Sequence, residues 1–230
     1  MYQRLYDAIT KYDADICSCG YYEESEDASW KYSHGCKNDL LVLDGPEQIY
    51  SELFRHESII GNGNWNKLFR QTILDDVRFK KYVVGEDVEF QCMAIHEAKR
   101  MVCISDVMYH YIHNPGNATS SKFRPQSMDI IAVVDSLLDF IKANHPRVLE
   151  QMYAYHLMWY MATVQVMHWS KDTRPYKKEK DQLRGVIINN FEKYKNNRYV
   201  YKLDKVFMYA FIYGLFRPVY SMFRIYRKMK

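Results

Sequence analysis

The sequence predicts an α/β fold followed by a mostly α-helical C-terminal region. Up to about residue 124, short apolar runs typical of strands alternate with segments of helical periodicity. After Pro125 the apolar residues recur at helical spacing only. Glycine and proline are scarce, at 9 and 6 of 230 residues, which argues against an all-β chain with many tight turns.

Helices and strands are expected to alternate in the first part of the chain. Tyr2, Leu5, Ile9 and Tyr12 recur at helical spacing, and an apolar strand-like run follows them directly. Pro46 suits the first turn of a helix that opens at Asp44 or Gly45. In chain order we expect a helix over 2–12, a strand over 14–22, a polar loop or irregular hairpin, a strand over 40–45, a helix to about residue 56, a helix over 86–98, and two short strands over 101–113 with a turn at residues 105–106.

The second part is expected to be a helical tail. Its apolar residues share one face over residues 127–143, and a longer segment over 148–170 is rich in Tyr, Met and Trp. Further helices are expected over 178–195 and 201–216. Pro218 should break or kink the last helix, because proline removes a backbone donor and clashes with the preceding turn.

Charge and composition limit the classes of partner. The formal net charge of +4 is too small to indicate nucleic acid. No segment has the roughly 18–20 apolar residues of a membrane span, and no apolar signal segment is visible near residue 1, so a cytoplasmic location is expected. The basic excess is confined to the end of the chain. Residues 201–230 contain Lys202, Lys205, Arg217, Arg224, Arg227, Lys228 and Lys230 against a single acid, Asp204.

The cysteines indicate reduced thiols. There are five, an odd number, and no CxxC pair occurs. Cys17 and Cys19 lie two residues apart in a strand-like run, which places both sulfurs on one face. Buried reduced thiols in the cytosol are expected. No metal-ligand spacing is seen nearby.

The stretch GEDVEF places Glu86 and Asp87 in the first turn of a predicted helix. Acids there are stabilised by the positive end of the helix dipole, which is a sufficient structural reason for the pair. The functional alternative is a general base, because a carboxylate presented beside a cleft can accept a proton from an attacking hydroxyl.

Two further motifs combine aromatic and polar residues. In NWNKLF, Trp65 can stack on a substrate ring, Asn66 can hydrogen-bond substrate hydroxyls and Lys67 can face a phosphate. The structural alternative is a buried Trp65 beside a solvated Asn–Lys pair. In YHYIHNPGN, the two tyrosines and His113 share a strand face. His113 can bind an anion or a metal there, or can be an ordinary surface or core residue.

Four motifs occur in one order along the chain: MYQRLYDAITKYDADICSCGYY, WNKLFRQTIL, GEDVEFQCMAI and VMYHYIHNPGNATSS. In order and spacing they resemble the second half of a family 2, GT-A type glycosyltransferase. The closest resemblance is to the bacterial enzymes that build capsular, exopolysaccharide or lipopolysaccharide glycans. The resemblance covers about residues 1–122. It implies that residues 1–124 are the C-terminal, acceptor-side part of a GT-A (nucleotide-diphospho-sugar transferase-like) domain. Residues 125–230, beyond the resemblance, are expected from their own pattern to be a helical tail with a basic amphipathic end.

The resemblance also implies roles for individual residues. Asp87 matches the catalytic base and Glu86 its partner in the motif. The WNK element, which borders the substrate cleft in the family, corresponds to Trp65, Asn66 and Lys67. In the last motif the family's arginine is absent, and His113 is expected to substitute for it in part. The family's serine in the following loop is replaced by Asn117, so His113 and Asn117 complete the expected substrate-binding residues.

The implied reaction is sugar transfer from a nucleotide sugar to a glycan or lipid-linked acceptor. The family's nucleotide-binding half with its DxD motif does not occur in this sequence. Asp13-Ala-Asp15 has the letters of a DxD motif, but it precedes a strand, whereas the family's motif ends one. The chain is therefore expected to be a fragment without a cofactor of its own, whereas the full-length parent would use Mg or Mn. The alternative is a non-catalytic accessory or degenerate module that binds glycan or membrane.

The basic end of the tail has two interpretations. It can be an interfacial helix on the anionic inner face of the plasma membrane, with Arg217, Arg224, Arg227 and Lys228 as contacts. It can equally be a core-packing helix with a solvated end. A membrane adaptor with no catalytic role is a third, weaker interpretation of the same segment.

Overall fold

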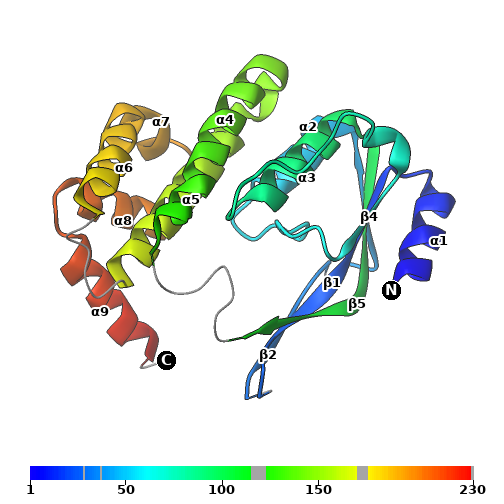
Figure 1. Cartoon of the computed structure of the whole chain (residues 1–230), viewed down its shortest axis with the longest axis horizontal. Helices are drawn as coiled ribbons and strands as arrows, with labels where there is room; N and C mark the ends of the chain where they lie inside the picture. The colour runs from blue at the N-terminus through cyan, green and yellow to red at the C-terminus, as the bar shows by residue number, and fades with distance from the viewer. Residues whose placement is uncertain (28, 37, 115–122, 170–175, 229–230) are drawn as a thin grey trace. The chain divides into compact units, whose positions relative to one another are not determined.

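The structure is a computed structural model that describes residues 1–27, 29–36, 38–114, 123–169 and 176–228. The chain divides into two compact units, Met1–Ser120 and Ser121–Lys230 (Figure 1). The first unit is α/β and the second is helical, so the predicted fold class is confirmed.

A mixed five-stranded sheet forms the centre of the first unit. Strands β1 (Ile16–Ser25) and β5 (Arg100–His113) run parallel to each other. β2 (Lys31–His34) and β4 (Lys67–Phe69) pair antiparallel with β1, and β3 (Leu40–Asp44) pairs antiparallel with β5. The order is β2-β1-β5-β3, with β4 off this path.

Strand β5 is continuous, and the prediction of two short strands is wrong. Between the pairs Ser18–Cys103 and Gly20–Val107, one residue of β1 faces three residues of β5. The residues expected to form a turn, 105–106, lie instead in this β-bulge. A bulge adds residues and bends the strand without reversing it, and it depends on the partner strand, which the local sequence does not reveal.

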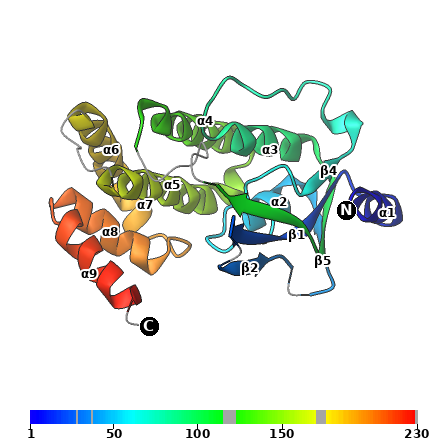
Figure 2. The ribbon, with the colours of Figure 1, turned by 60° about the horizontal axis from the view of Figure 1, so that its bottom comes forward.

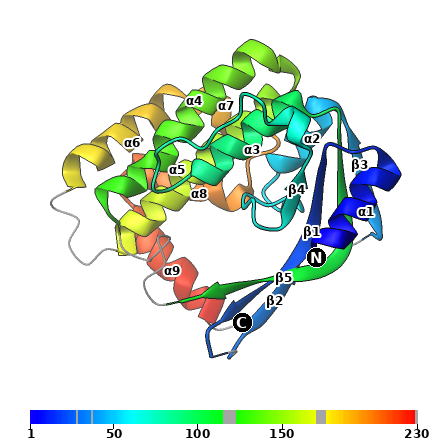
Figure 3. The same cartoon turned by 45° about the vertical axis from the view of Figure 1, so that its right-hand side comes forward.

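Helix α1 (Tyr2–Tyr12) covers one face of the sheet (Figures 1 and 3). Leu5 and Ile9 of this helix pack in one buried cluster with Cys17, Cys19 and further apolar residues of β5. Both sulfurs therefore lie on the same face, as the alternation predicts. All five cysteines are free thiols, and four are buried.

Helices α2 (Gly45–Leu53) and α3 (Glu86–Glu97) lie on the other side of the sheet (Figure 3). They pack on each other, and the buried Tyr50 hydroxyl donates to the carbonyl of Cys92 at 2.6 Å. Gly85 precedes α3 with a positive φ of 96°, a conformation that glycine adopts without strain. This glycine fixes where α3 begins and hence where its acids lie.

The second unit is built around a long central helix, α5 (Leu149–Trp169), against which four other helices pack. A partly buried polar network connects α5 with α4 (Asp129–Asn144) and α7 (Phe191–Lys195). His156 hydrogen-bonds Asp135 and Tyr194, each at 2.8 Å, and Tyr160 donates to Asp135 at 2.8 Å. The other helices of this unit are α6 (Lys177–Asn189), α8 (Lys202–Ile212) and α9 (Phe216–Lys228), with short 3-10 turns at Pro125–Met128 and Pro146–Val148. A further 3-10 turn, Gln71–Ile73, lies in the first unit.

Two predictions about the tail differ from the structure. The helix expected over 178–195 is divided at Asn190 into α6 and α7. Pro218 does not break a helix but lies in the first turn of α9, where its missing N–H costs no helical hydrogen bond. The chain reverses before it at Gly214, which has a φ of 76°.

Candidate functional site

The WNK and ED motifs lie close together in the first unit. The loop Ile60–Asn66 leads into β4, which pairs with β1 through Ser18 and Lys67. The start of α3 approaches this loop, because Asn64 hydrogen-bonds Asp87. The structure thus brings together the residues that the two motifs predict.

Lys67 lies inside the protein, only 5% exposed. Its ammonium donates to the carbonyls of Ile60 at 2.7 Å and Gly63 at 2.5 Å, and to Oδ1 of Asn66 at 3.1 Å. An ammonium has three protons to donate, so these acceptors use its full capacity. The structure therefore places Lys67 beneath the loop as its clamp, whereas the sequence suggested a phosphate contact.

The burial of Lys67 predicts a pH-dependent stability. Desolvation lowers its pKa from 10.5 to about 7. Between pH 7 and pH 10.5 the unfolded chain therefore binds more protons than the folded protein. The free energy of unfolding should rise with pH in this range, by up to about 1.4 kcal/mol per pH unit. Urea unfolding at several pH values from 7 to 10 would measure the slope, and Lys67→Met should remove this component. Equal slopes in both proteins would contradict the assignment.

Asn66 is buried and binds the neighbouring strand. Its Nδ2 donates to the carbonyl of Cys19 at 2.6 Å, and the Cys19 N–H donates to the carbonyl of Asn66 at 3.1 Å. Because its Oδ1 accepts from Lys67, both ends of the amide are occupied. Asn66 fixes the loop to β1 and is not presented to a substrate hydroxyl as the sequence suggested.

Trp65 packs on tyrosines of the sheet. Its ring is stacked on those of Tyr109 and Tyr111, with centroid distances of 4.3 and 5.4 Å, and meets Tyr21 edge-on at 4.8 Å. Gly63 lies against the indole so closely that an added Cβ would be 2.3 Å from Nε1. The indole thus anchors the loop, and this anchoring requires glycine at position 63.

Asp87 is the carboxylate that the site presents. It lies in the first turn of α3, half-buried, and Nδ2 of Asn64 donates to its Oδ1 at 3.0 Å and to its backbone carbonyl at 3.2 Å. Within the described part of the chain, its Oδ2 has no hydrogen-bond or ion-pair partner. Glu86 precedes it at the first helical position. One oxygen of Asp87 is thus held in place while the other can accept a proton.

A second polar group lies on the sheet beyond the tyrosines. Glu23 of β1 accepts from Nε2 of His113 at 2.6 Å and from Nε2 of His34 at 3.0 Å. The ring of His113 meets Tyr111 edge-on at 5.1 Å and lies 5.3 Å from Trp30. Tyr109, Tyr111 and His113 therefore do share one face, as the alternation predicts. Asn117 lies outside the described residues.

Sequence reasoning did not single out Asn64 or Glu23. Asn64 contacts Asp87 across 23 positions and Glu23 contacts His113 across 90, so no local pattern connects either pair. The signal for Asn64 was its place at the start of the NWNKLF motif. Glu23 could have been found only by assuming that β1 pairs in parallel with β5.

The acids near the end of α1 are used within the protein. Oδ2 of Asp15 accepts the backbone N–H groups of Lys99 and Arg100 at 2.7 and 3.3 Å, and Arg70 bonds Asp13 at 3.0 Å. Across the described residues no three His, Cys, Asp or Glu side chains come together in a way that could hold a metal ion.

The basic residues predicted for membrane contact belong to α9. Arg217 and Arg224 lie seven residues apart, on the same side of this helix. Arg227 and Lys228 are also in α9, but their side chains lie outside the described residues. None of the described helices is both long and apolar enough to cross a membrane.

No family model matches this chain, but it is similar to known proteins both in sequence and in structure. Over 133 residues, 54% of this chain, the sequence is 28% identical to an uncharacterized glycosyltransferase, EpsJ, of Bacillus subtilis (strain 168). The structure matches that of S. aureus TarS 1–349 in complex with UDP-GlcNAc with a TM-score of 0.57 and 16% identity, over 96% of this chain.

The chain spans only part of each relative, 37% of EpsJ and 64% of the TarS chain. The sequence match is to a glycosyltransferase, and the structural match shows a shared fold over nearly the whole chain. The resemblance to a bacterial glycosyltransferase that the ordered motifs indicate is thereby confirmed. The chain resembles bacterial glycosyltransferases in sequence over about half of its length and in fold over almost all of it.

Proposed function

We propose that this chain supplies the catalytic base and the acceptor side of a family 2, GT-A type glycosyltransferase. The enzyme would transfer a sugar from a nucleotide sugar to a glycan or lipid-linked acceptor in polysaccharide biosynthesis. The observation that carries the proposal is Asp87, which α3 presents with one oxygen held by Asn64 and the other without a partner in the described structure. The TarS structure is a complex with UDP-GlcNAc, and this supports a nucleotide sugar as the donor.

In the proposed reaction, Asp87 accepts the proton of the acceptor hydroxyl while that oxygen bonds to the anomeric carbon of the donor. The bond from this carbon to the nucleotide diphosphate breaks, and the diphosphate leaves with the electron pair. Asn64 keeps the base in position, and the loop that carries it is clamped by Lys67 and anchored by Trp65. Positioning and proton transfer are the contributions of this chain.

The nucleotide and metal side would come from elsewhere. We propose that Mg or Mn is held by a nucleotide-binding half that this sequence does not contain. That half would be an upstream part of a longer protein or a second chain. We also propose a cytoplasmic location with peripheral membrane contact.

Two measurements test the proposed function. The DNA upstream of Met1, read in frame, is expected to encode a DxD-bearing segment, or a neighbouring gene should do so. The complete enzyme, incubated with a set of radiolabelled nucleotide sugars and membrane extract, is expected to label a glycan or lipid product. If no donor is turned over once both halves are present, the enzymatic proposal is wrong.

A non-catalytic glycan-binding module is the second candidate, and the aromatic row on β5 favours it. Tyr109, Tyr111 and His113 line one sheet face together with the carboxylate of Glu23. Aromatic rings beside a hydrogen-bonding carboxylate can bind sugars. This candidate predicts polysaccharide binding that does not depend on donor or metal, in a chain with no turnover.

A further inference from the structure

Helix α9 packs one apolar face inward and exposes another. Phe216 and Tyr220 are buried, and the ring of Phe207 from α8 lies 5.7 and 5.3 Å from theirs. On the opposite side, Met222 and Ile225 are 71% and 62% exposed. A helix at a protein surface normally has polar residues on its outer face. Core packing therefore explains the inner apolar face of α9 but not the exposed Met222 and Ile225.

Exposed apolar residues also follow one side of α8. Val206, Tyr209 and Tyr213 recur at i, i+3 and i+7, which places them on one stripe. The two helices lie side by side, as Figure 2 shows and their ring contacts require. We name the exposed apolar residues of these two helices, of the turn between them and of the residue before α8 the α8–α9 surface. It consists of Tyr201, Val206, Tyr209, Tyr213, Leu215, Met222, Ile225 and Tyr226, each more than a third exposed.

Positive charge accompanies this surface. Arg217 and Arg224 form a stripe along α9, about 80–100° around the helix from the exposed Ile225. Residues 201–230 contain seven Lys or Arg and one acid, and that acid, Asp204, is buried at 8% exposure. Apolar side chains with tyrosines and flanking cations form the composition that binds at the headgroup level of anionic membranes.

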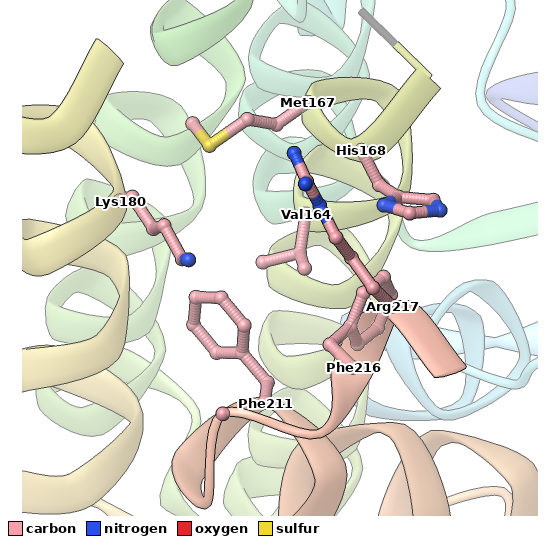
Figure 4. A pocket seen from close by; sticks show the side chains of 8 residues that line it. Val164, Met167, His168, Lys180, Phe211, Phe216 and Arg217 are labelled. Carbon is pink, nitrogen blue, oxygen red and sulfur yellow. The ribbon is translucent and has the colours of Figure 1, made fainter. Parts of the chain in front are cut away.

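A basic pocket of about 100 Å³ adjoins the start of α9 (Figure 4). Lys180 and Arg217 contribute its cations, and its described lining contains no acid. Burial, and to a smaller extent the positive charges of Arg217 and Arg224, lower the pKa of His168 on its wall. The lining consists of Val164, Met167, His168, Lys180, Phe211, Gly214, Phe216 and Arg217.

We propose that the α8–α9 surface binds an anionic lipid bilayer, with its apolar side chains at the headgroup boundary and with Arg217 and Lys180 against lipid phosphates. Such a surface needs no membrane-spanning helix, and none is found among the described residues. Its biological purpose rests on the proposed function, because a lipid-linked acceptor would be presented at this interface. The binding itself does not depend on catalysis.

Vesicle sedimentation tests the proposal with the full chain. The protein is expected to bind vesicles that contain about one third phosphatidylglycerol, and to bind phosphatidylcholine vesicles at least about tenfold more weakly. Met222→Ser with Ile225→Ser should reduce binding to the anionic vesicles by about tenfold or more, because each removes buried apolar area at the interface. Arg217→Gln with Lys180→Gln should have an effect of similar size, and added salt should weaken binding of the wild-type protein.

Matched controls distinguish binding through the α8–α9 surface from nonspecific adsorption to vesicles. Tyr2→Ser with Tyr6→Ser removes two residues of α1 that are 66% and 59% exposed, and Lys177→Gln with Lys178→Gln removes two exposed cations of α6. Both controls should bind vesicles as the wild type does, and a thermal melt should show that every variant is folded. Absence of binding to anionic vesicles, or equal binding by test and control variants, would overturn the proposal.

Two further outcomes are decisive. A lipid-free dimer whose interface buries Met222 and Ile225 would assign the surface to a second copy and overturn the proposal. Asp87→Asn should bind vesicles normally. Failure of catalysis is therefore distinguishable from failure of membrane binding.

Discussion

Replacement of Asp87 by Asn is expected to lower sugar transfer by the complete enzyme by a factor of about 10²–10⁴. The amide keeps the size of the carboxylate but cannot accept the proton of the acceptor hydroxyl. Nucleotide-sugar binding should remain unchanged, because the donor is proposed to bind to the other half of the enzyme. Initial rates with a radiolabelled donor and calorimetric titration of the donor would measure both quantities.

Glu97→Gln is the matched control for this variant. Glu97 lies at the opposite end of α3 and is exposed, so its replacement should leave the rate unchanged. Asn64→Ala tests positioning: it should lower kcat more than it raises KM, because the base remains but is no longer held at 3.0 Å. Undiminished transfer by Asp87→Asn would remove Asp87 from the mechanism.

Most helices and strands follow from local patterns. The apolar spacing in Tyr2–Tyr12 and the glycine before Glu86 are local signals, and α1 and α3 begin within one residue of the predicted positions. The bulge at residues 105–106 could not be predicted, because it arises from the mismatch between β5 and β1. The role of Pro218 depends on the chain reversal at Gly214, which sets where α9 begins.

For the candidate site, as for the fold, the sequence indicates the local features but not the contacts between distant residues. The motif order makes Asp87 and Trp65 candidate site residues, but it does not show which side chains hold them. Lys67 illustrates the reason, because a lysine beside an aromatic residue looks like a ligand contact in the sequence. Only the folded loop shows that carbonyls from Ile60 and Gly63 converge on its ammonium.

Lys67→Met is expected to lower the free energy of unfolding by about 3 kcal/mol. Methionine approximates the volume of the lysine stem but leaves the carbonyls of Ile60 and Gly63 and the Oδ1 of Asn66 without their donor. A buried acceptor that loses its partner costs about 1–3 kcal/mol. The sum is partly offset, because the variant no longer has to desolvate an ammonium group.

The loss should appear as a lower urea midpoint with an unchanged m-value. Lys81→Met is the control, since Lys81 is an exposed lysine of the same unit and its replacement should change stability by less than about 0.5 kcal/mol. If the clamp also positions Asn64, the complete enzyme with Lys67→Met should lose activity even at temperatures where it is fully folded. A variant as stable and as active as the wild type would show that water can replace the ammonium, and that the loop holds Asp87 in place without it.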